Sequence, residues 1–356
     1  MNSSFSNLTI LQRQSAIQRL TALWAFTESG LGGVMHAFQI PFTGLLVGGM
    51  AVIMISLIAK LSEGSYRQVL KSALIVLIVK AMVSPHTPFP AYIAVSFQAL
   101  SGYVLFRLFS VNSISIILLS TISMVESAIQ KILILTLFFG NSLWKAMDGM
   151  VSFLTAQFGF ISSYGSYWII CIYLLIYLAG GFLIAWLALR TINNFYRNSP
   201  ALNLESISSI THDHVQVKTF SGKNNYKKLW GLALLMLTIS LILFFLSPDT
   251  KQGWLAVIRM FIWTLSAIFV WYMLIGPLFT KAIKNFLHKK ESRYSEEVLK
   301  TLSFLPVMRK LATITWQQSK LYNGFRRWSY FLSALIHAAL TYSEPQNTEA
   351  PFNNPV

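Results

Sequence analysis

The chain has 356 residues, of which 54% are hydrophobic and only 11% are charged, and its formal net charge is +16. Ordinary soluble domains carry about 25% charged residues, so this composition excludes a typical soluble protein. The bases lie in the gaps between long apolar segments and form no basic–aromatic module, which argues against a nucleic-acid partner. The apolar segments do not alternate as barrel strands would. We therefore predict an all-α, polytopic membrane protein.

Apolar segments close to the roughly 20 residues needed to cross a bilayer recur along the first half of the chain. They predict a six-helix membrane domain within residues 1–190. Its expected spans are 16–33, 38–59, 69–83, 91–109, 113–140 and 166–189. A proline-rich loop, SPHTPFP (84–90), separates the third span from the fourth. A connection rich in serine, glycine and aromatic residues (141–165) separates the fifth from the sixth, with room for a surface helix.

The second half is predicted to contain a cytosolic linker (191–228), a two-helix membrane hairpin (229–279), basic amphipathic helices (280–342) and a disordered tail (343–356). In the amphipathic part, apolar residues recur at three- or four-residue steps and mark one helix face. They are Val298, Leu302, Leu305, Met308 and Leu311. We expect this stripe to pack on the membrane surface or on a partner, and Pro306 to break or kink its helix.

Lysine and arginine cluster in alternate gaps between the spans, and cytoplasmic loops are the ones that carry such an excess. The pattern predicts a multi-pass protein of the cytoplasmic (inner) membrane. Both termini are expected in the cytoplasm, and the loop 84–90 is expected outside.

The segment 28–49, ESGLGGVMHAFQIPFTGLLVGG, combines six glycines and one proline with three polar side chains suited to ligand contact. Glycine and proline weaken a continuous helix, and irregular backbone at membrane depth is tolerated where it lines a cavity. An ionisable residue at membrane depth is therefore treated as a candidate functional residue. We expect a broken or re-entrant element facing a cavity; the alternative is a glycine-rich helix contact with Glu28 at a membrane edge.

The expected pocket faces outward and takes a polar small molecule. Its expected lining residues are Glu28, His36, Gln39 and Thr43, with His86 in the closing loop and Gln98 at the flank. Glu28, His36 and His86 are possible transition-metal ligands, but two histidines in separate loops are a weak signal, and no metal or other cofactor is predicted. Nucleophile-elbow, phosphate-loop and zinc-protease motifs are absent from the chain, so no enzymatic activity is predicted.

Residues 16–190 resemble the substrate-binding component of energy-coupling-factor (ECF) importers, which are six-helix membrane proteins. Three features carry the resemblance: the polar, glycine-rich segment 28–49, PFTGLLVGG at 41–49, and KAMVSPHTPFPAYIAVSFQALSGYVLF at 80–106. The resemblance implies that the chain binds a vitamin-like micronutrient from outside, and that separate ATPase subunits drive transport. Residues 229–342 more loosely resemble the transmembrane coupling subunit of such importers, in which cytosolic amphipathic helices follow membrane helices.

The leading hypothesis is therefore a micronutrient-binding membrane component whose partners are a small-molecule substrate, the lipid bilayer and separate ATPase and coupling subunits. The alternative is a structural or assembly membrane protein that docks partners through its basic tail. A third hypothesis, a lipid- or prenyl-processing membrane enzyme, is weakened by the missing motifs.

Overall fold

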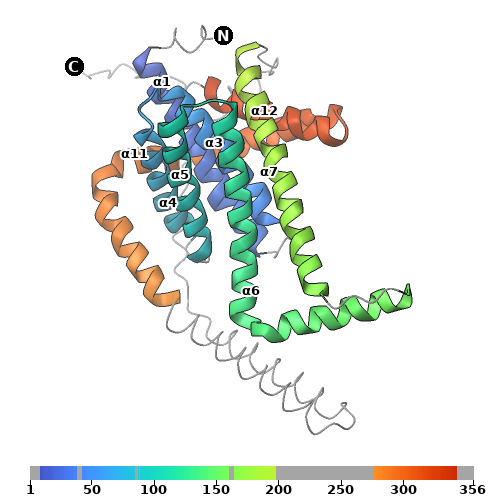
Figure 1. Cartoon of the computed structure of the whole chain (residues 1–356). Coiled ribbons are helices and arrows are strands. Elements are labelled where there is room, and N and C mark those ends of the chain that lie inside the picture. The colour runs from blue at the N-terminus through green and yellow to red at the C-terminus, as the bar shows by residue number, and fades with distance from the viewer. Residues whose placement is uncertain are drawn as a thin grey trace, which may run out of the picture. The chain divides into compact units, whose positions relative to one another are not determined.

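The computed structural model describes residues 9–37, 42–84, 87, 89–159, 164–197 and 276–342. Throughout these ranges the regular secondary structure is helical (Figure 1). The predicted linker from residue 198 onward, the two spans of the predicted hairpin and the tail 343–356 lie outside the described residues, apart from a few at the end of the hairpin. The predicted start of the linker at 191 is wrong, because residues 191–197 continue helix α7 (Gly165–Arg197). The described residues fall into two compact units, one within Met1–Gln130, Cys171–His212 and Phe279–Val356, the other within Lys131–Ile170 and Asp213–Leu278.

The chain enters the first unit through α1 (Ile10–Phe26), which begins at a capping box. The Thr9 hydroxyl accepts the main-chain N–H of Gln12, and the Gln12 side chain accepts the N–H of Thr9. The two bonds satisfy donors that a helix start leaves without partners. A π-helical turn, η1 (Thr27–Leu31), and the short helix α2 (Gly32–Ala37) continue from α1.

Helix α3 (Thr43–Leu61) lies at the centre of the first unit, where it packs against α1, α4 (Arg67–Val83) and α5 (Phe89–Phe109). Its apolar window is 78% buried, as expected for a helix that is apolar on all sides. The helix starts just after Phe42, whose φ of 62° is left-handed. The Phe42 ring meets Tyr173 and Tyr177 of α7 (Gly165–Arg197) at centroid distances of 6.4 and 6.1 Å.

Four helices in the described part are long and apolar enough to cross a membrane. They are α3, α5, residues Ser113–Asn141 of α6 (Ser113–Gln157), and residues Gly165–Asn193 of α7. They coincide with the second, fourth, fifth and sixth predicted spans. Helices α1 and α4 form where the first and third spans were predicted, and each has 17 residues.

The outer helices expose large apolar side chains, unlike the central α3. Leu100, Leu108, Ile114, Leu175 and Phe182 are each more than half exposed on α5, α6 and α7. Soluble monomers rarely leave large contiguous apolar areas uncovered. The exposure suits helices whose outer faces contact lipid.

The predicted connection 141–165 is largely helical. Within α6 the backbone leaves helical geometry at Gly140, with a φ of 63°, and the helix then resumes to Gln157, so this connection does hold a helix. In the second unit, the Asp148 carboxylate accepts the main-chain N–H of Ser166 at 2.6 Å. This bond, in the first turn of α7, lowers the pKa of Asp148.

The C-terminal part comprises α11 (Gly276–Gln318), the 3₁₀ turn η3 (Ser319–Leu321) and α12 (Gly324–Thr341). The expected break at Pro306 is wrong: α11 runs through Pro306, and its non-helical backbone falls at Tyr294. The tertiary packing of α11 outweighs the lost hydrogen bond of the proline.

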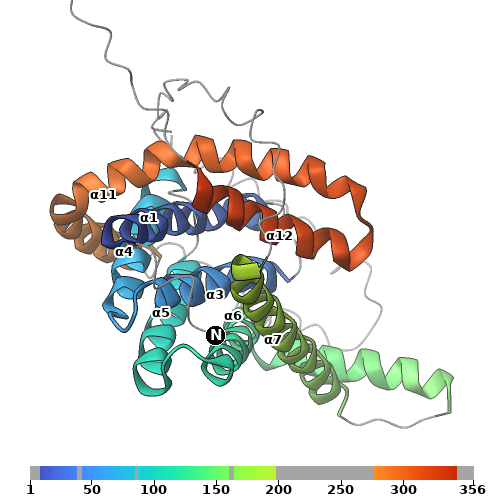
Figure 2. The same ribbon diagram turned by 90° about the horizontal axis from the view of Figure 1, so that it is seen from above.

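The predicted stripe packs on the chain's own N-terminal helices. Val298, Met308 and Leu311 are buried in one apolar core with Leu20 and Leu23 of α1. The Arg19 guanidinium also donates to the main-chain oxygen of Leu340 at 2.6 Å, and Figure 2 shows α11 and α12 running alongside α1. The apolar face is therefore covered from within the chain.

Candidate functional site

A buried ion pair joins the π-helical turn to α4. The Lys80 ammonium donates to the Glu28 carboxylate at 2.6 Å, and the two side chains are 2% and 4% exposed. Lys80 also lies over the ring of Tyr92 on α5, with its nitrogen 5.9 Å from the ring centroid. The pair thus connects the π-helical turn, α4 and α5 inside the bundle.

Such a pair is expensive to form inside a protein. Removing each ion from water costs several kcal/mol even after relaxation, and mutual attraction compensates only when the geometry is good. Breaking a buried pair by removing one partner typically costs about 3–5 kcal/mol. Apolar residues at both positions would serve stability as well, so the retained charges point to a role beyond packing.

The π-helical turn is the local feature that carries Glu28. Gly30, Gly32 and Gly33 weaken α-helical geometry in this segment, and the backbone widens by one residue within the turn. Such π-turns are frequent at functional sites. The described residues show a π-helical turn and no break, because the chain stays helical up to Ala37. The predicted broken or re-entrant element facing a cavity stays a prediction.

Gln98 and Thr43 are buried as well. Gln98, on α5, is 1% exposed, and its Oε1 atom has no hydrogen-bond partner within the described ranges. A Cβ atom added at Gly48 would lie 2.8 Å from Gln98 Nε2, so a larger residue there would have to displace the Gln98 amide. Thr43 is buried at the first residue of α3.

The remaining predicted site residues are not placed as side chains. The backbone of His36 lies in α2, but its side chain, together with all of Gln39 and His86, lies outside the described residues. Among the residues that are placed, no hydrogen bond links Gln98 to Glu28 or Lys80. The described ranges hold no group of three or more potential metal ligands.

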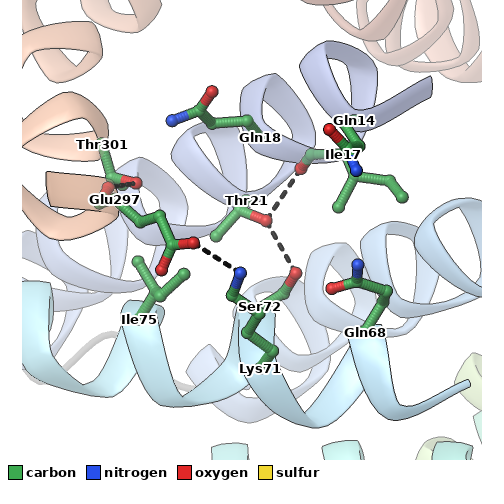
Figure 3. Close-up of a pocket in the computed structure, with 10 residues that line it drawn as sticks. All are labelled: Gln14, Ile17, Gln18, Thr21, Gln68, Lys71, Ser72, Ile75, Glu297 and Thr301. Atoms are coloured by element: carbon green, nitrogen blue, oxygen red, sulfur yellow. Dashed lines mark hydrogen bonds and ion pairs between the residues drawn. The ribbon is translucent and has the colours of Figure 1, made fainter. Parts of the chain in front are cut away.

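A second polar site is a cavity of about 270 Å³ between α1, α4 and α11 (Figure 3). On each helix the lining residues recur three or four positions apart, so they share one face. The lining residues are Gln14, Ile17, Gln18 and Thr21 of α1, Gln68, Lys71, Ser72 and Ile75 of α4, and Glu297 and Thr301 of α11. This volume is near the lower limit of small-molecule pockets and suits a small metabolite.

The cavity lining is polar but has no excess charge. The Thr21 hydroxyl donates to the Ser72 hydroxyl at 2.8 Å, and Lys71 forms an ion pair with Glu297. Three amide side chains, Gln14, Gln18 and Gln68, add donors and acceptors (Figure 3). A neutral or zwitterionic molecule with several hydrogen-bonding groups matches this lining.

The two polar sites lie on the same pair of helices. Thr21 meets Ser72, and Glu28 meets Lys80, so α1 and α4 run in the same direction. The cavity lies near the starts of these helices, and the ion pair lies roughly two turns further along both. The predicted orientation places the cavity towards the cytoplasm and the ion pair towards the outside.

No family model, curated protein or solved structure matches the chain. Function is therefore inferred from the geometry of the two polar sites. Both offer fixed polar groups inside a bundle of apolar helices, and neither presents an arrangement of nucleophile and base among the described residues.

Glu28 and Gln98 were among the residues predicted from the sequence, whereas Lys80, the ion-pair partner of Glu28, was not. The cavity was missed completely. Its signal is a polar stripe, Gln14, Gln18 and Thr21, on one face of an apolar helix. A similar stripe on α4 begins at Gln68, and the match between the two stripes would have predicted a polar interface.

Proposed function

We propose that the chain is the substrate-binding membrane component of an importer for a small, polar, vitamin-like molecule. The observation that carries the proposal is the buried Glu28–Lys80 pair at a π-helical turn. Charged residues inside membrane bundles are rare and mark substrate or ion pathways. Gln98, with its unbonded amide oxygen, adds a buried group that a substrate could satisfy.

The cavity between α1, α4 and α11 supports the same function. A substrate released on the inner side would pass polar groups there before reaching the cytosol, and Lys71 and Glu297 provide a pair that can open. Each of these two side chains is 37% exposed, so the pair contributes little stability. The resemblance to ECF importers implies separate subunits that hydrolyse ATP.

Native mass spectrometry of gently purified protein tests the proposal. We expect the wild-type chain to carry a bound small molecule and the double variant Glu28→Met/Lys80→Met to lose it while remaining folded. Gln98→Met should also release the molecule, and it removes an acceptor that has no partner, so folding should not suffer.

The matched control is Glu296→Met/Lys300→Met, which makes the same chemical changes at exposed positions on α11. This variant should retain the bound molecule. A wild-type protein without a bound molecule, or a folded Glu28→Met/Lys80→Met variant that keeps it, would contradict the proposal and favour a structural or assembly role.

The proposed importer requires the 84–90 loop to face outward. A cysteine at Thr87, in a Cys171→Ser background, should react with a membrane-impermeant thiol reagent in intact cells. A cysteine at Ser65, in the turn between α3 and α4, should react only after permeabilisation, because Lys60 and Arg67 flank it. The reverse labelling pattern would show the opposite orientation.

A further inference from the structure

The turn between α11 and α12 carries an exposed mixture of apolar, aromatic and basic side chains. We call residues 316–328 the hairpin tip. Leu321 is 87% exposed, Trp328 is 49% exposed and Tyr322 is 37% exposed. Lys320 and Arg326 are exposed beside them. Large apolar side chains on an otherwise polar turn indicate that something other than water contacts this surface.

The charge of this region has one sign. Residues 309–342 contain five lysine or arginine residues and no aspartate or glutamate. The Arg327 guanidinium stacks over Trp316 at 4.3 Å from the ring centroid, and Trp316 also contacts the ring of Trp328 at 5.1 Å. Tryptophan with arginine or lysine is the combination enriched where membrane meets water.

The part of α12 that follows the hairpin tip already packs against the chain's own core. Leu335, Ile336 and Ala339 of α12 are buried in the same core as α1. In Figure 1, α12 lies crosswise to the first part of α6 (113–130), which belongs to the same compact unit, at the level of the end at which α6 begins. A helix crosswise to a candidate span, near that span's end, lies in the plane where an interfacial helix is expected.

We propose that the hairpin tip inserts into the headgroup region of an anionic bilayer leaflet, on the side of the membrane where α6 begins. Leu321 and Trp328 enter the boundary between headgroups and acyl chains, and Lys320 and Arg326 contact the lipid phosphates. The absence of acidic residues from 309–342 favours an anionic lipid surface over a mixed-charge protein surface. The contact goes beyond the proposed import function and does not depend on it.

Spin-label accessibility in the full chain tests this contact. A nitroxide at Leu321→Cys, in the Cys171→Ser background, is measured in vesicles of phosphatidylcholine mixed with phosphatidylglycerol. We expect high accessibility to oxygen and low accessibility to a water-soluble nickel chelate, which is the pattern of a lipid-exposed site. A label at Ser65→Cys, in an exposed turn, serves as the aqueous control and should show the reverse.

Two further measurements test the role of charge. In vesicles of phosphatidylcholine alone, the nickel accessibility of the label at Leu321→Cys should rise several-fold. Adding Lys320→Gln and Arg326→Gln should produce the same rise in the mixed vesicles and leave the Arg327–Trp316 stacking intact. High nickel accessibility in the mixed vesicles, or low accessibility to both reagents because protein covers the tip, would overturn the proposal.

Discussion

Replacing Lys80 with methionine is expected to lower the free energy of unfolding by about 3–5 kcal/mol, because the Glu28 carboxylate then stays buried without its counter-ion. Glu28→Met should cost a similar amount, since it leaves the Lys80 ammonium unpaired. The double variant should recover most of the loss, because two apolar side chains of similar volume need no counter-ion. Thermal or denaturant unfolding of the purified protein in detergent measures all three.

The exposed pair of variants on α11, Glu296→Met and Lys300→Met, provides the control, and exposed charges are expected to change stability by less than about 1 kcal/mol. Single variants at Glu28 and Lys80 that unfold like the wild type would show that the two groups are not a buried pair. Because the double variant is expected to fold, any loss of substrate binding in it reports on the charges themselves.

Gly181→Val is expected to produce the second largest loss, about 1–3 kcal/mol, by forcing α6 and α7 apart. A Cβ atom added at Gly181 would lie 3.1 Å from the Cα atom of Thr121. The obstacle is backbone, so no flexible side chain can move away from the added group. The separation would also strain the 2.6 Å bond from the Ser120 hydroxyl to the Gly181 oxygen. A lowered unfolding temperature is the readout.

Gly149→Val tests whether replacing a helical glycine lowers the stability of this chain when no close contact is disturbed. A Cβ atom at Gly149 meets nothing within 4 Å, so this variant should unfold at or slightly above the wild-type temperature. Equal losses at Gly181 and Gly149 would rule out close helix packing as the cause.

The positions of the helices were predictable because apolar length and periodicity are local properties of a sequence. The spans expected at 91–109 and 113–140 correspond closely to Phe89–Phe109 and Ser113–Asn141. The start of α1 at Ile10 was not predicted, although the capping box at its N-cap Thr9 is a local signal as well. Charge in the gaps, by contrast, predicts an orientation, which thiol labelling at Thr87 and Ser65 tests.

The contacts between helices were not predictable, because they join residues far apart in the chain. Glu28 and Lys80 are separated by 52 positions, and the sequence around either residue does not indicate that the other is its partner. The stripe containing Val298 and Met308 was correctly identified as one helix face, but an amphipathic pattern does not specify what covers it. Here α1 of the same chain covers it, which is neither the membrane surface nor the separate partner that was predicted.

The bond between Arg19 and Leu340 joins positions 321 residues apart. A ribosome adds roughly 5–20 residues per second, so Leu340 is made about 15–65 s after Arg19. Throughout that interval the face of α1 that α12 later covers has no native neighbour. Nascent chains therefore depend on the insertion machinery or on chaperones for longer than the early helices alone would require. Chains truncated before α11 would retain that uncovered face.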